Sequence, residues 1–150
     1  MHSVVISGTG LYQPPYTISN AELVDVFNRY VDEQNTLHAG EIAAGSRPAL
    51  PYSSVEFIEK ASGIQQRYVI EKSGLMDPAR MCPRLSERPD DQLSLMAEIG
   101  VDAAQKALAA AGRTGDQIDA VLCAASNMQR AYPAMAVEIQ QALGAGGYGF

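Results

Sequence analysis

The sequence predicts an α/β layered fold, with a mixed, largely parallel sheet and flanking helices. Two observations support this prediction. Short apolar runs of strand length alternate along the chain with segments whose apolar residues recur at helical spacing. Turns containing glycine or proline separate most of these segments. Because helices lie between the strands, the connections are crossovers, which place neighbouring strands parallel to one another.

The first strand and the first helix are expected near the N-terminus. The apolar run Ser3–Ser7 is closed by Gly8 and Gly10, which is the pattern of a buried strand. A proline-containing loop follows, and Asn20 is positioned to cap a helix. The apolar face of this helix consists of Leu23, Val26, Phe27, Tyr30 and Val31.

Two segments with little periodicity, at about 32–53 and 71–90, are expected to be insertions. Both are rich in residues that interrupt helices and strands, and long loops of this kind are usually functional or mobile. The first is expected to be a lid-like loop that contains a helical turn around Ala39–Ala44.

Between these segments the pattern predicts a short helix and a strand. Ser53 and Glu56 have the spacing of a capping box, in which each side chain satisfies a backbone N–H of the first turn. Gly63 can adopt the left-handed conformation that ends the helix. Gln66–Ile70 then alternates as a strand does.

The C-terminal part is expected to hold a helix, a strand and a helix. The first helix begins after Pro89, with Asp90 or Asp91 as its cap, and ends at Gly112. Small residues dominate its second half, so another segment is expected to pack closely there. The apolar run 118–126 predicts a strand buried on both faces. The last helix has Pro133 in its first turn.

The final segment, GAGGYGF, matches the dinucleotide-binding pattern G-x-G-x-x-G at Gly144, Gly146 and Gly149. That fingerprint requires a strand before the glycines and a helix after them, whereas here a helix precedes them. We therefore expect Gly144 to end the last helix and the other glycines to form a turn into a strand that begins near Tyr148.

Composition limits the function. The chain has 150 residues, a net charge of −6 and 47% hydrophobic residues, which suits one globular domain. The acidic balance argues against nucleic acid and against an anionic membrane surface as partners. The two cysteines and two histidines have no metal-ligand spacing, and no signal peptide or membrane span is evident. A reduced, cytoplasmic protein is expected.

Two segments carry candidate binding residues. Phe57 lies near Lys60 and Arg67, so its ring can stack on a nucleotide base while the cations meet phosphates. The alternative is that Phe57 belongs to the core. The second segment, 126–134, follows a predicted strand and ends near Tyr132; it either lines a site at the carboxyl edge of the sheet or only connects two elements.

Four segments together resemble one family, the 3-oxoacyl-acyl-carrier-protein synthase III enzymes, which have the thiolase fold. The segments occur in the family's order and near its spacing, and they include the G-I-x-x-R pattern from Gly63 to Arg67. They read VVISGTGLYQPPYTISNAEL, EFIEKASGIQQRYVI, AAQKALAAAGRTGDQIDAVLCAASN and AYPAMAVEIQQALG. The resemblance implies that residues 1–150 form an incomplete N-terminal thiolase-like domain.

The resemblance also implies a reaction in fatty-acid biosynthesis. An acyl group passes from acyl-CoA to a cysteine thiolate, and malonyl-acyl carrier protein then loses CO₂ and attacks the acyl-enzyme. The family's catalytic Cys, His and Asn match no residue of this chain, so the chain alone is expected to be inactive. No metal and no separate cofactor are implied, because coenzyme A enters as the thioester substrate.

The resemblance assigns roles to a few residues. Phe57 matches an aromatic that stacks on the CoA adenine, and Ser53 and Ser62 match hydroxyl residues near the CoA nucleotide. Ala61 stands where some members have an arginine, a loss for which Lys60 can compensate. In a further match, Tyr132 corresponds to an aromatic that reaches across a homodimer interface into the partner's acyl pocket.

Two alternatives remain open at this stage. The same fold supports other acyl transfers, including hydroxymethylglutaryl-CoA, polyketide and quinolone synthesis, and residues outside this chain would distinguish them. A non-catalytic α/β binding module is the alternative of a different class.

Overall fold

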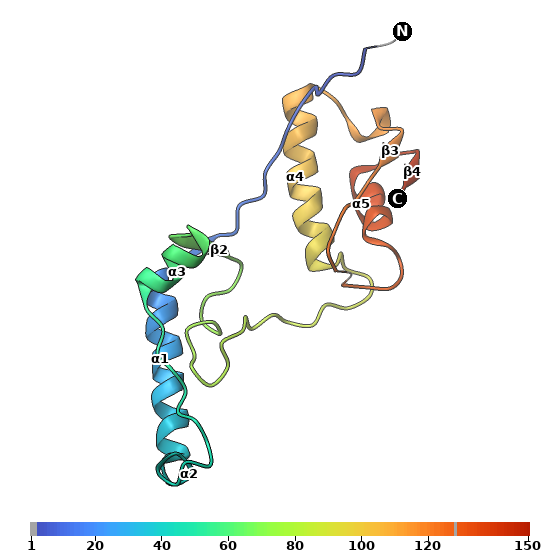
Figure 1. Ribbon diagram of the computed structural model, residues 1–150. Helices are drawn as coiled ribbons and strands as arrows, with labels where there is room; N and C mark the ends of the chain where they lie inside the picture. Colours follow the sequence, from blue (N-terminus) through green and yellow to red (C-terminus); the bar gives the residue numbers. More distant parts are fainter. Residues whose placement is uncertain (1–2, 128) are drawn as a thin grey trace. The chain divides into compact units, whose positions relative to one another are not determined.

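The computed structural model describes residues 3–127 and 129–150, and its contacts divide the chain into two compact units. We call Gln13–Ser86 the inner unit, and Met1–Tyr12 together with Glu87–Phe150 the terminal unit. The inner unit contains β1 (Tyr16–Ser19), α1 (Asn20–Leu37), α2 (Ala39–Ala43), α3 (Val55–Ser62) and β2 (Gln66–Val69) (Figure 1). The terminal unit contains α4 (Leu95–Ala111), the 3₁₀ turn η1 (Gly115–Gln117), β3 (Ala120–Val121), α5 (Met135–Leu143) and β4 (Tyr148–Gly149).

In the inner unit, β1 and β2 form an antiparallel pair that runs from Tyr16 opposite Val69 to Ser19 opposite Gln66. The sequence predicted β2 correctly but assigned β1 to a loop. The prolines just before β1 suggested the loop, whereas pairing with β2, distant in sequence, makes the segment a strand.

Helix α1 begins one residue earlier than predicted. Its cap is Ser19, whose hydroxyl accepts a hydrogen bond from the amide of Glu22 at 3.2 Å. The Glu22 carboxylate accepts in return from the Ser19 amide at 2.9 Å, which completes a capping box. Asn20, predicted as the cap, is instead buried within the first turn.

The segment expected as a lid-like loop is largely ordered. Helix α1 continues to Leu37, and the predicted helical turn is present as α2. Hydrogen bonds from α1 side chains then hold residues 50–53 against the helix.

The terminal unit is built on the packing of α4 against α5. Ala97, Val101 and Ile139 form its buried core. Gly100 permits this contact, because a Cβ added there would lie 2.6 Å from Ile139 Cδ1. Helix α5 in turn contacts β3 and β4, and Val121 of β3 packs against the core that α4 and α5 share (Figure 1).

Two of the predicted strands differ from the structure. Ser3–Ser7 has no regular structure, and the side chain of Val4 is 97% exposed. Only Ala120–Val121 of the run 118–126 is a strand, and Leu122 beside it is 79% exposed. A strand is buried when other elements cover both faces of a sheet in which it has neighbours. Among the described residues, β3 has a single partner strand, β4, and therefore belongs to a two-stranded sheet. The prediction of two-sided burial is therefore wrong for this chain.

The predicted close packing on α4 is confirmed. Gly8 and Gly10 lie so near the α4 backbone that an added Cβ would overlap the carbonyl oxygens of Ala107 and Ala103, respectively. The Lys106 ammonium also donates to the Leu11 carbonyl at 3.1 Å. Glycine on one side and alanine on the other let the two backbones approach each other.

The final glycines act as the sequence predicted. Gly144 ends α5 with a left-handed φ of 67°. Gly147 then lies directly against the Asp119 carbonyl, and Tyr148 begins β4, which pairs in parallel with β3. The segment is a helix end and a turn, not a phosphate loop. Nor does any helix within the described ranges have the length and apolarity that a bilayer crossing requires.

Candidate functional site

The candidate site is the exposed surface of α3, the short helix that carries Phe57 and Lys60. Phe57 is 67% exposed, so the alternative that it belongs to the core is wrong. Lys60 lies three residues further along, on the same side of the helix, and is also exposed. An aromatic ring and a primary ammonium therefore share one accessible surface, which is a suitable arrangement for a base and a phosphate.

The start of α3 is set by Ser54 rather than by Ser53. The Ser54 hydroxyl accepts from the Phe57 amide at 3.1 Å, and Ser54 has the extended conformation of a cap. The predicted box between Ser53 and Glu56 does not form, because the cap lies one residue later and the third helical residue is then Phe57. The reason is tertiary, because the side chain of Asn28 binds both the amide and the carbonyl of Ser53.

The end of α3 explains the G-I-x-x-R pattern. Gly63 takes a left-handed φ of 69° and ends the helix, as predicted. The Asn20 side chain then donates to the Ile64 carbonyl at 2.6 Å and accepts from the Arg67 guanidinium at 2.9 Å. Arg67 is thus engaged with α1, which leaves Lys60 as the exposed cation beside Phe57.

Ser62, the other predicted nucleotide contact, already uses its hydroxyl within the helix end. Its hydroxyl donates to the Ile58 carbonyl at 2.8 Å and accepts from the Ile64 amide at 3.2 Å. A hydroxyl has one proton to donate, so Ser62 would have to release Ile58 in order to donate to a phosphate.

A small apolar cavity of about 270 Å³ lies between α1, α3 and the loop that follows β2. Phe27, Ile58 and Leu75 line it, and Ser53 borders it. Ile58 thus faces inward while its neighbour Phe57 faces solvent, so the two residues define the inner and outer sides of α3.

Two carboxylates hold the surrounding loops. The Lys72 ammonium, 2.6 Å from Glu22, and the Ser19 amide lower the pKa of Glu22 to about 2. The Arg84 amide, 2.6 Å from Glu71, and the hydroxyl of Ser73 lower the pKa of Glu71 to about 2. The ordinary value for both is 4.5.

We expect acid to loosen the inner unit as these two groups take up protons. Since both folded-state pKa values are lowered, their stabilisation is complete above pH 4.5 and is lost as the pH falls toward 2. Lys72→Met should raise the pKa of Glu22. The stabilisation that Glu22 contributes should then be lost at a higher pH than in the unaltered chain. A carboxyl ¹³C NMR titration of both proteins measures this directly. A Glu22 pKa that stays near 2 in the variant would contradict the assignment to Lys72.

In the other predicted segment, 126–134, which belongs to the terminal unit, two side chains bind backbone groups at or near the start of α4. Gln129 accepts from the Met96 amide at 3.0 Å at the start of α4, and Arg130 donates to the Gln92 carbonyl at 2.7 Å. Tyr132 differs, because its side chain is 91% exposed. Met128 lies outside the described residues.

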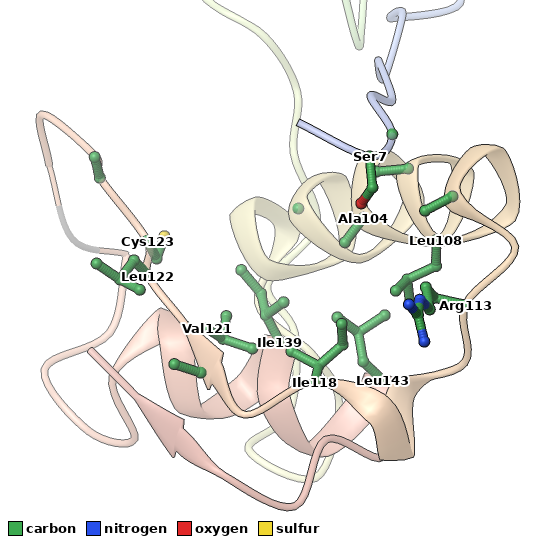
Figure 2. A pocket seen from close by; sticks show the side chains of 16 residues that line it. Ser7, Ala104, Leu108, Arg113, Ile118, Val121, Leu122, Cys123, Ile139 and Leu143 are labelled. Atoms are coloured by element: carbon green, nitrogen blue, oxygen red, sulfur yellow. The ribbon is translucent and has the colours of Figure 1, made fainter. Parts of the chain in front are cut away.

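In the part of the chain that the structure describes, neither the cysteines nor the aliphatic cavity of the terminal unit forms a reactive centre. Cys123 packs against the α4–α5 core, and the Arg80 guanidinium near Cys82 binds the backbone carbonyls of Cys82 and Pro83. A cavity of about 510 Å³ in the terminal unit is lined mainly by aliphatic side chains, with Arg113 beside Ile118 and Leu143 at one end (Figure 2). Among the residues described, no cluster of His, Cys, Asp and Glu could hold a metal ion.

Known proteins resemble this chain in sequence. It is 52% identical over 127 residues to the beta-ketodecanoyl-[acyl-carrier-protein] synthase of Pseudomonas aeruginosa, a match that covers 85% of the chain and 36% of the relative. It is 31% identical over 151 residues to the beta-ketoacyl-[acyl-carrier-protein] synthase III of Granulibacter bethesdensis, covering 100% of the chain and 33% of that protein. The chain thus spans about a third of the length of these relatives. No family model matches it.

Solved structures show the same fold. The 3-oxoacyl-[acyl-carrier-protein] synthase III of Aquifex aeolicus superposes with a TM-score of 0.60 at 20% identity, covering 97% of this chain and 33% of that one. OleA of Xanthomonas campestris gives 0.61 at 16% identity, covering 97% and 33%. The fold is therefore the thiolase-type α/β fold. Taken with the sequence matches, the beta-ketoacyl-[acyl-carrier-protein] synthase III enzymes are the family that this chain resembles.

Proposed function

We propose that this chain is part of a condensing enzyme of fatty-acid biosynthesis and that α3 provides its contact with the nucleotide of coenzyme A. The relationship to named synthases supports the reaction class. The single structural observation that carries the binding site is the 67% exposure of Phe57, a large aromatic that the fold leaves in solvent beside Lys60.

The reaction proceeds in two transfers. A cysteine thiolate attacks the acyl-CoA thioester and releases the CoA thiol, and the acyl group remains on sulfur. Malonyl-acyl carrier protein then loses CO₂, and the carbanion attacks the acyl carbonyl, which forms the new carbon–carbon bond and frees the thiolate. Residues outside this chain supply the nucleophile and the groups that stabilise the enolate, so neither Cys82 nor Cys123 takes that role.

The printed name of one relative suggests the chain length of the acyl-CoA that starts the reaction. The relative with 52% identity is named for a beta-ketodecanoyl product. Because malonyl contributes two carbons, that product is built from an acyl group two carbons shorter. We therefore propose a medium-chain acyl-CoA as the primer.

At the α3 surface, the adenine stacks on the Phe57 ring and the Lys60 ammonium meets a phosphate. Ser53, at the start of the helix, lies near the nucleotide, and Ser62 contributes only if it exchanges its bond to Ile58. Local cations are needed because CoA is an anion and the chain carries a net charge of −6.

The proposal extends to assembly. Tyr132 is 91% exposed, although a tyrosine side chain is largely apolar. We propose that it enters the acyl pocket of a second copy in a cytoplasmic homodimer, where its phenol would shape the end of the pocket.

Replacing Phe57 with alanine should weaken CoA binding by about tenfold, because base–aromatic stacking contributes about 1–3 kcal/mol per base. Isothermal titration of the chain with CoA measures the effect. Phe57→Trp, which retains an aromatic face, should bind at least as tightly as the original. Equal dissociation constants for Phe57→Ala and the unaltered chain would contradict the site.

A further inference from the structure

We propose that Asn28 is a positioning residue for the CoA-binding surface of α3, an inference that rests on the function proposed above. The carboxamide of Asn28 donates to the Ser53 carbonyl at 3.1 Å and accepts from the Ser53 amide at 2.9 Å. It therefore holds the peptide groups of the residue that immediately precedes the α3 cap, Ser54.

Helix α3 depends on such bonds because it has little packing of its own. The structure describes every residue of α3, Val55–Ser62, and none of these residues is buried. The helix is only partly covered on its inner side, where Ile58 lines the small apolar cavity beneath it. Hydrogen bonds from α1 hold it at both ends, from Asn28 before its start and from Asn20 to the Ile64 carbonyl just beyond its end.

The direction of Phe57 follows from the start of the helix. While Asn28 binds the peptide groups of Ser53, Ser54 is the cap, and its hydroxyl accepts a hydrogen bond from the Phe57 amide at 3.1 Å. If Ser53 is released, Ser53 and Ser54 can both act as caps, since Ser53 also has capping-box spacing to Glu56. The helix start then varies, and Phe57 no longer has one orientation before the ligand arrives.

The chain contains a matched control. Asn35 lies about two helical turns beyond Asn28 on α1 and grips Leu50 in the same way, donating to its carbonyl at 3.1 Å and accepting from its amide at 2.8 Å. Each asparagine makes two hydrogen bonds to the backbone of the irregular segment 50–53. Only Asn28 does so next to α3, so the two differ in position and not in chemistry.

The experiment compares Asn28→Ala with Asn35→Ala in the 150-residue chain. We expect Asn28→Ala to raise the CoA dissociation constant by about tenfold and Asn35→Ala by less than about twofold. Hydrogen exchange at the Phe57 amide should accelerate in Asn28→Ala alone. Asn28→Asp, which keeps the acceptor for the Ser53 amide but loses the donor, serves as a second variant in case the alanine protein folds poorly.

A double variant tests whether Asn28 acts through Phe57. If it does, Asn28→Ala adds no further loss of affinity in a Phe57→Ala background. Additive losses, or equal affinities for the Asn28→Ala and Asn35→Ala proteins, would overturn the inference while the original chain still binds CoA. Absence of CoA binding by the original chain would instead overturn the proposed function.

Discussion

Replacing Glu138 with alanine is expected to destabilise the terminal unit by about 3–5 kcal/mol, because it breaks a buried ion pair by removing one partner. Glu138 is 4% exposed, and its carboxylate accepts from the Ser94 amide at 2.8 Å and the Ser94 hydroxyl at 2.7 Å. The Arg130 guanidinium lies 3.2 Å away. The alanine variant would leave the fully buried Ser94 without these partners at the point where it caps α4.

Glu98 provides the comparison for this substitution. It lies in the first turn of α4 as Glu138 lies in the first turn of α5, and it pairs with Arg88, but its side chain is 57% exposed. Glu98→Ala should therefore cost no more than about 1 kcal/mol. Urea unfolding, together with hydrogen exchange of the α4 amides, measures the loss of stability in the Glu138→Ala and Glu98→Ala proteins. Equal losses in the two variants would show that the buried network does not stabilise α4.

Replacing Gly147 with alanine is expected to cost about 3 kcal/mol and to open the β3–β4 pair. A Cβ there would overlap the Asp119 carbonyl, a backbone group that cannot rotate away as a side chain can. The same carbonyl accepts from the Tyr148 amide at 3.0 Å, and the Phe150 amide donates to the Val121 carbonyl at 2.8 Å. These bonds are the ladder that the added methyl group would separate.

The neighbouring Gly146 is the control, since no atom lies within 4 Å of a Cβ built on it. Gly146→Ala should change stability by no more than about 1 kcal/mol. Exchange of the Tyr148 and Phe150 amides reports on the ladder, and the urea midpoint reports on global stability. If both glycine variants retain slow exchange at these two amides, the close contact at Gly147 does not limit the fold.

Local patterns predicted the helices and their ends well. Helical spacing located α1, α4 and α5, and glycines 63, 112 and 144 each end a helix in the left-handed conformation. Helix starts were less accurate, because distant side chains select among several possible caps. Asn28 makes Ser54 the cap of α3, and Glu138 holds Ser94 at the start of α4. No short sequence window contains both partners.

The strands and the candidate site were also predicted incompletely, because they too depend on contacts between distant segments. The apolar runs around Val4 and Leu122 have the composition of buried strands, but burial depends on neighbours that local composition does not specify. The spacing of Phe57 to Lys60 was compatible with a binding site or with a core position, so the exposure of Phe57 could not be derived from spacing alone. Asn28 had no signal, because a single asparagine in an amphipathic helix matches no motif.

The contact between Gly8, Gly10 and α4 has a consequence for synthesis on the ribosome. Leu11 meets Lys106 across a separation of 95 residues. At about 5–20 residues per second, the start of the chain waits on the order of ten seconds for its partner helix to be made. During that interval Gly8 and Gly10 have no helix backbone to pack against, so this contact of the terminal unit cannot form until α4 has been synthesised.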